Sequence, residues 1–234
     1  MSNVSKNLLR VVNSLECGGS ETPDYTPLAL PAQLGYSNAF STLGMESTVK
    51  HLTFAELEAA LDHLRRAPQD DGLVHLIVRR PEVDQREGVN EAELDVVKGL
   101  IGDNWFVRGS KRTPDGSAHP EMQINIMNSR VTELVAQEME RWPLAGDQLY
   151  IDMDLSRENL PAGSHIAIGT AVLEVSALPH TGCHKFVARF GKEAMQFVNS
   201  DLGKELCLRG INARIVQSGF IKIGERARKL TNGK

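Results

Sequence analysis

Residues 149–175, LYIDMDLSRENLPAGSHIAIGTAVLEV, carry the pattern that decides the fold. Apolar and polar side chains alternate through 149–155, as in a strand that buries one face. A turn signal at 159–163 follows, and 165–169 and 171–175 are then predicted as two further short strands. Short strands at such close spacing favour a β-barrel over repeated strand–helix–strand units.

Strand patterns continue on both sides of this stretch. Residues 73–78 are an almost continuous apolar run of strand length, and residues 122–127 alternate apolar and polar side chains. Three more strands are predicted toward the C-terminus, at 206–210, 213–216 and 219–224. The sequence therefore predicts many short strands and few helices.

Helices are indicated at three places between these strands. Thr53 and Glu56 form a capping box for an amphipathic helix that Pro68 ends. Asn128 or Ser129 can cap a second helix, and residues 191–199 should form a third. We expect a mainly β fold with accessory helices, of the α+β class.

Composition narrows the class of protein. The 234 residues are 41% hydrophobic and 24% charged, which is ordinary for a globular protein. The 26 basic and 30 acidic residues are well mixed, so we expect no nucleic-acid partner. We expect no membrane partner and a cytoplasmic protein, because no apolar run has the length of a membrane span or of a signal-peptide core. The three cysteines are far apart and predicted to be reduced thiols.

The densest reactive chemistry lies in residues 180–185, HTGCHK. Cys183 stands there beside His180, His184 and Lys185, and neighbouring cations stabilise the thiolate that a reactive cysteine needs. We predict these four residues as a catalytic set. If 183–190 continues as a strand, alternation places Cys183 on its more polar face.

Other interpretations of this loop stay open. A single cysteine is usually a small buried hydrophobic residue. Zinc is not expected, because the loop offers no fourth ligand. A Cys–His dyad of the protease type has no orienting partner that the sequence reveals.

The order of the motifs resembles a MOSC domain, the module named after the C-terminal part of molybdenum-cofactor sulfurases. The matching pieces are residues 99–105, 123–130, 144–150, 159–163, the Cys183 loop, 209–216 and 219–224. Residues 51–80 look like the lead-in of stand-alone bacterial members. The resemblance implies a MOSC-type β-barrel over 90–226. Residues 1–89 would then be an arm, helix and strand that pack on or complete the barrel, and 227–234 a basic tail.

The resemblance also implies a link to molybdenum cofactor (molybdopterin), with Cys183 as a persulfide carrier of sulfane sulfur or as a molybdenum ligand. Because a pterin cofactor carries a phosphate that arginine suits, the predicted cofactor-binding residues are Arg209, Asn212, Arg189 and Asp103. Pyridoxal phosphate binds the full-length sulfurases through a separate domain, and 234 residues leave no room for it.

Two functions follow from the resemblance. The first is a sulfur transferase or a component of a molybdenum-dependent oxidoreductase, which the resemblance links to detoxification of N-hydroxylated compounds. The alternative is a non-catalytic module that binds or delivers the cofactor. The expected partner is a molybdoenzyme or a sulfur-donor protein, and the sequence leaves the oligomeric state open.

Overall fold

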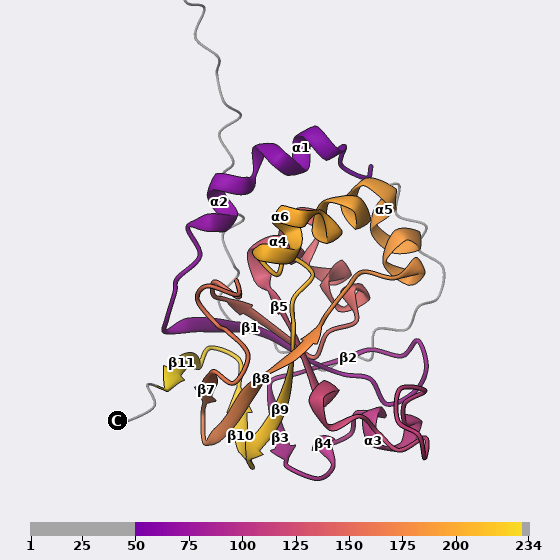
Figure 1. Ribbon diagram of the computed structural model, residues 1–234, viewed down its shortest axis with the longest axis vertical. Helices are drawn as coiled ribbons and strands as arrows, with labels where there is room; N and C mark the ends of the chain where they lie inside the picture. The colour runs from indigo at the N-terminus through magenta and orange to yellow at the C-terminus, as the bar shows by residue number, and fades with distance from the viewer. Residues whose placement is uncertain (1–49, 231–234) are drawn as a thin grey trace, which may run out of the picture. The chain divides into compact units, whose positions relative to one another are not determined.

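The computed structural model describes residues 50–230 (Figure 1). Its α-helices are α1 (Phe54–Ala59), α2 (Leu61–Arg65), α3 (Trp105–Arg108), α4 (Ser129–Ala136), α5 (His184–Asn199) and α6 (Asp201–Glu205). Two 3₁₀ helices are η1 (Pro120–Met122) and η2 (Met139–Ala145). The strands are β1 (Gly72–Arg79), β2 (Glu87–Val89), β3 (Glu91–Asp95), β4 (Gly99–Leu100), β5 (Ile124–Asn128), β6 (Leu149–Asp152), β7 (His165–Ile168), β8 (Ala171–Pro179), β9 (Ile211–Gln217), β10 (Gly219–Lys222) and β11 (Arg226–Leu230).

Strands in the described part of the chain close into a β-barrel. The order is β11-β7-β8-β9-β5-β6-β1, and pairing of β1 with β11 completes the ring. Neighbours in the ring are antiparallel except β5 and β6, which are parallel. β10, β3 and β4 form a separate three-stranded sheet. The predicted α+β fold with a β-barrel is confirmed.

The alternation in β6 sorts its side chains between two cores. Leu149, Ile151 and Met153 are buried in the cluster that fills the barrel. Tyr150 belongs to the second cluster, between the barrel and the helices, and its hydroxyl donates to the carbonyl oxygen of Trp142 at 2.8 Å. Each buried side chain of this size contributes about 1.5–3 kcal/mol. The strand is therefore held from both faces.

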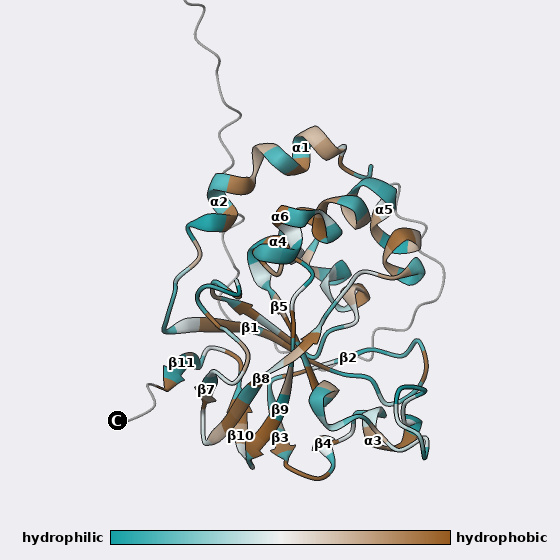
Figure 2. Ribbon diagram, in the orientation of Figure 1, coloured by the Kyte–Doolittle hydropathy of each residue, from teal (hydrophilic) through white to brown (hydrophobic). Residues whose placement is uncertain are grey.

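Helices α1, α4 and α5 supply the other wall of this second core. Figure 2 shows hydrophobic residues concentrated on the barrel strands, while the helices carry both kinds of residue. The predicted capping box starts α1: Thr53 N donates to Glu56 Oε2 at 2.7 Å, and Glu56 N donates to Thr53 Oγ1 at 3.3 Å. The helix predicted before Pro68 is present, but it is divided into α1 and α2 at Ala60.

The prediction of a strand over 183–190 is wrong, because these residues form the first turns of α5. Phe186 and Phe190 are buried side by side, with ring centroids 4.8 Å apart. The helix breaks at Gly191, whose φ is 90°, and a Cβ there would lie 2.8 Å from His51 Nδ1. Only the second segment of α5, after this break, matches the helix predicted over 191–199.

Two further predictions, a strand over 206–210 and a basic tail from 227, differ from the structure. Residues 206–210 are a turn rather than a strand, and Cys207 has a positive φ of 49° within it. Residues 226–230 form β11, which pairs with β1 and β7, whereas the sequence predicted a basic tail from 227. Only Ala227 of β11 is buried, so the strand has no apolar pattern of its own.

Between residues 50 and 230, no helix combines the length and the apolar character needed to cross a bilayer. The predicted N-terminal arm, with Cys17, lies outside the described residues, and so do residues 231–234.

Candidate functional site

The loop that carries Cys183 connects β8 to α5. Cys183 is the N-cap residue of α5, and its thiol is free, exposed and makes no capping hydrogen bond. Behind it, Gly182 N donates to Asn199 Oδ1 at 3.0 Å, which ties the loop to the far end of the helix. A side chain at Gly182 would require Met195 to move, because its Cβ would lie 2.5 Å from Met195 Sδ. The loop is therefore anchored while the thiol stays accessible.

The three consecutive predicted site residues do not converge on one another. His184 is exposed like Cys183. Lys185 Nζ instead pairs with Asp84 Oδ1 at 2.7 Å, and Arg189 Nη2 donates to the same oxygen at 3.2 Å. The hydrogen bond from Lys185 is the main cause of a lowered pKa at Asp84. The ammonium predicted to stabilise the thiolate thus has a carboxylate partner.

His180, the fourth predicted residue, lies in a buried cluster with Asp147 and Arg209. Arg209 Nη1 donates to Asp147 Oδ2 at 2.7 Å, and Arg209 Nη2 donates to the carbonyl oxygen of Ala145 at 2.9 Å. The Arg209 guanidinium also lies over the Phe186 ring, 5.1 Å from its centroid. Asp147 is fully buried, and its Oδ1 faces His180 Nδ1 at 3.4 Å.

The electrostatics of this cluster follow from its burial. Burial lowers the pKa of His180 well below its ordinary value, and the positive charges of Arg209 and Arg80 lower it further. His180 is therefore a neutral imidazole. Burial pushes the pKa of Asp147 up while the Arg209 charge opposes that shift. The short ion pair with Arg209 keeps the carboxylate in its charged form.

The remaining predicted cofactor-binding residues are engaged inside the protein. Asp103 accepts two hydrogen bonds from the Arg80 guanidinium, at 2.8 and 3.0 Å, and both side chains are buried. Asn212 accepts from Asn125 Nδ2 at 2.6 Å and donates to the Leu178 carbonyl oxygen at 3.0 Å. Arg189 Nη1 donates to the Leu144 carbonyl oxygen at 2.7 Å. Each of these three side chains therefore has hydrogen-bond partners within the protein.

A cavity of about 610 Å³ opens beside His180. It lies beside the stretch of β8 and β9 in which the pairing shifts register between Val175 and Pro179. Its wall is largely apolar, and its polar groups come from Arg157, Ser176, His180, Thr181, Lys204 and Arg209. The volume suits a small-molecule ligand.

The cysteine that lines this cavity is Cys207, not Cys183. Burial raises the pKa of the Cys207 thiol, which favours the protonated thiol over the more reactive thiolate. The sequence placed Cys207 in a buried strand, whereas the structure places it half-buried on a turn. Thr181 and Gly182 separate Cys183 from His180 in the chain.

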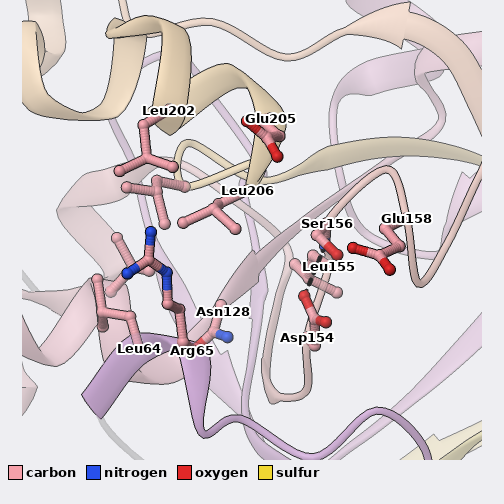
Figure 3. Close-up of a pocket in the computed structure, with 12 residues that line it drawn as sticks. Leu64, Arg65, Asn128, Asp154, Leu155, Ser156, Glu158, Leu202, Glu205 and Leu206 are labelled. Atoms are coloured by element: carbon pink, nitrogen blue, oxygen red, sulfur yellow. Dashed lines mark hydrogen bonds between the residues drawn. The ribbon is translucent and has the colours of Figure 1, made fainter. Parts of the chain in front are cut away.

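A second, smaller pocket of about 270 Å³ lies between α2, α6 and the chain after β6. Figure 3 shows Leu64, Leu202 and Leu206 around Arg65 on one side and Asp154, Ser156 and Glu158 on the other. Within the described residues, no three histidine, cysteine, aspartate or glutamate side chains are grouped so as to hold a metal ion.

Sequence reasoning missed Asp147, Arg80 and Cys207 as members of the site. Asp147 follows Gly146, and a Gly–Asp pair is typical of an ordinary turn. Arg80 follows a predicted strand, where an arginine is typical of a solvated strand end, and its carboxylate partner comes from a distant loop. No local pattern marks these contacts, since only the closed barrel brings the residues together.

Comparison with known proteins gives structural similarity alone. No protein-family model matches the sequence, and no curated protein does. Among solved structures, the YuaD protein from Bacillus subtilis is 16% identical, with a TM-score of 0.48 over 68% of this chain and 94% of that one. YiiM from Escherichia coli is 17% identical, with a TM-score of 0.46 over 69% of this chain and 71% of that one. Similarities this low say nothing about the function of this chain.

Proposed function

We propose that the protein is a MOSC-type, molybdenum-cofactor-associated protein that handles sulfur through Cys183. The ordered motifs over residues 90–226 support the family, and the closed barrel is compatible with it. The observation that carries the mechanism is the free, exposed thiol at the N-cap of α5. A sulfur carrier needs an accessible sulfur, and the amide groups at a helix start favour an anion.

The cavity beside His180 supports the cofactor part of the proposal. Molybdopterin is an anionic pterin, and Arg157 and Lys204 supply positive charge at this cavity. Arg209, which also lines the cavity, has a buried Nε without a hydrogen-bond partner. When bound, molybdenum would supply atom-transfer and two-electron redox chemistry. The residues of this chain would bind and orient the cofactor.

Sulfur handling at Cys183 is a thiolate displacement. The Cys183 thiolate attacks the terminal sulfur of a donor persulfide, a new S–S bond forms on Cys183, and the donor leaves as a thiolate. The step needs a sulfur-donor partner and no oxidant. A molybdoenzyme would receive the sulfur, and detoxification of N-hydroxylated compounds would depend on that enzyme.

The first prediction concerns the persulfide. After incubation with a polysulfide donor and trapping by alkylation, mass spectrometry of the wild-type protein should find one added sulfur on the peptide that contains Cys183. Cys207→Ser is the matched control and should keep this signal, whereas Cys183→Ser should lose it. A persulfide on Cys207 alone, or on neither cysteine, would overturn the sulfur-carrier proposal.

The second candidate function is a non-catalytic module that binds or delivers the cofactor. It is favoured by one observation: basic side chains line the cavity, and Cys183 does not. Retention of molybdenum cofactor by Cys183→Ser, together with full resistance of cells to N-hydroxylated bases, would select this function over sulfur transfer.

A further inference from the structure

His180 is placed at the boundary between a buried ion pair and the cavity. Its Nδ1 is buried and faces Asp147 Oδ1 at 3.4 Å, and neither atom has a hydrogen-bond partner. The imidazole itself lines the cavity. Since one ring nitrogen is directed at Asp147, the other, Nε2, is the nitrogen available to a ligand.

Asp147 and Arg209 fix the state of this imidazole. The carboxylate opposite Nδ1 favours the tautomer that carries its proton there, which leaves a lone pair on Nε2. Arg209 holds the carboxylate in place through its 2.7 Å contact and is itself held by the Ala145 carbonyl oxygen. Burial beside Arg209 and Arg80 keeps the ring neutral, because it lowers the pKa of His180. A neutral imidazole with a free Nε2 accepts a hydrogen bond.

The rest of the cavity limits the class of ligand. Leu160, Val175, Leu178, Val198 and Ile211 give it an apolar wall. Besides Arg209, which is paired with Asp147, the cationic side chains at the cavity are Arg157 and Lys204. Both are exposed, and Lys204 also pairs with Asp201 at 3.5 Å. The lining therefore suits a ligand with an anionic group at one end, near Arg157 and Lys204, and an apolar body against the apolar wall.

We propose that the cavity binds a small organic anion with an apolar body and an O–H or N–H group, and that His180 Nε2 accepts the hydrogen bond of that group. Asp147 and Arg209 are the positioning residues. The inference rests on the cavity named in the proposed function, but it needs neither molybdenum nor Cys183.

A matched pair of probes tests the ligand class. 4-Hydroxybenzoate carries a carboxylate, a ring and a hydroxyl donor, and benzoate lacks only the hydroxyl. Calorimetric titration of the wild-type protein should show 4-hydroxybenzoate binding roughly tenfold more tightly, as one net hydrogen bond allows. In His180→Phe this difference should disappear while benzoate affinity is kept, and Arg157→Gln should weaken both probes.

Several results would overturn the inference: no binding of either probe, equal affinity of both for the wild-type protein, or equal loss of both in His180→Phe. Cys183→Ser should bind both probes like the wild type. Probe binding without any persulfide on Cys183 would therefore reject the sulfur-carrier function and retain this inference.

The positioning role has its own spectroscopic readout. In ¹⁵N-labelled protein, with His180→Phe used for assignment, the His180 ring should be neutral and protonated at Nδ1 between about pH 6 and 8. Asp147→Asn should shift the ring toward the other tautomer. Protonation at Nε2 in the wild-type protein, or an unchanged tautomer in Asp147→Asn, would contradict the assignment.

Discussion

Asp103 and Asp84 both pair with arginine, but their surroundings differ. Asp103 and its partner Arg80 are buried, and the pair makes two parallel hydrogen bonds. Asp84 is more than half exposed, and its partners Lys185 and Arg189 contact it from the surface. Removal of one partner is costly only where the other charge is left buried. Burial, and not the presence of an ion pair, decides the stability that each contributes.

This contrast gives a prediction at the residue scale. Asp103→Ala should lower the free energy of unfolding by about 3–5 kcal/mol, because Arg80 is left buried without its carboxylate. The matched control, Asp84→Ala, should cost less than about 1 kcal/mol, because water solvates its partners. Urea denaturation measures both, and equal losses would contradict the argument.

Helix α5 and strand β11 show how much of the fold the sequence could reveal. The strands of the barrel are visible as alternation, and the predictions at 73–78, 122–127, 149–155, 165–169, 171–175, 213–216 and 219–224 each overlap a strand. Phe186 and Phe190 are four residues apart, a spacing that puts both on one face of either a strand or a helix. Because this spacing fits both structures, the sequence did not predict the first turns of α5 as a helix.

Strand β11 could not be predicted, because its stability comes from its neighbours. Its exposed cations, Arg226 and Arg228, surround one buried alanine, and the strand forms by pairing with β1 and β7. The candidate site likewise depends on contacts between residues that are far apart in the sequence. Cys183 was visible as a residue type, whereas the contact between His180 and Asp147 depends on the closed barrel.

Gly191 gives a prediction at the scale of the element. Gly191→Ala should lower stability by about 1–3 kcal/mol, because a side chain is strained at its φ of 90° and the Cβ would approach His51. Gly163→Ala is the control for strain alone, since φ there is 86° and nothing lies within 4 Å. In thermal unfolding, Gly191→Ala should lose more stability than Gly163→Ala, and adding His51→Ala should restore part of that loss. Equal losses of stability in the two glycine variants would show that contact with His51 contributes nothing.

The charge balance of the whole molecule predicts its response to acid. Burial lowers the pKa of His75 and of His180, so the unfolded chain binds more protons just below the ordinary histidine pKa of about 6.5. The free energy of unfolding should therefore fall as pH falls through that value. Asp84 and Glu174, whose pKa values are lowered by cationic partners, lose their contribution only at more acidic pH. Asp147, with its pKa raised by burial, acts in the opposite direction there.

Urea midpoints at about pH 7.5 and 5.5 would measure this effect, since the two values bracket the ordinary histidine pKa. His180→Gln should reduce the difference between the two midpoints, because the variant loses the group whose protonation opposes folding. An unchanged difference in the variant would show that His180 is not a source of the acid sensitivity.

The pairing of β1 with β11 has a consequence for synthesis of the chain. These strands come from opposite ends of the described residues, and β11 is also the partner of β7. Until Arg226–Leu230 has left the ribosome, β1 and β7 each keep an unpaired edge at this seam. The nascent barrel therefore stays open until β11 has been translated, and the exposed edges make that interval the period of greatest aggregation risk.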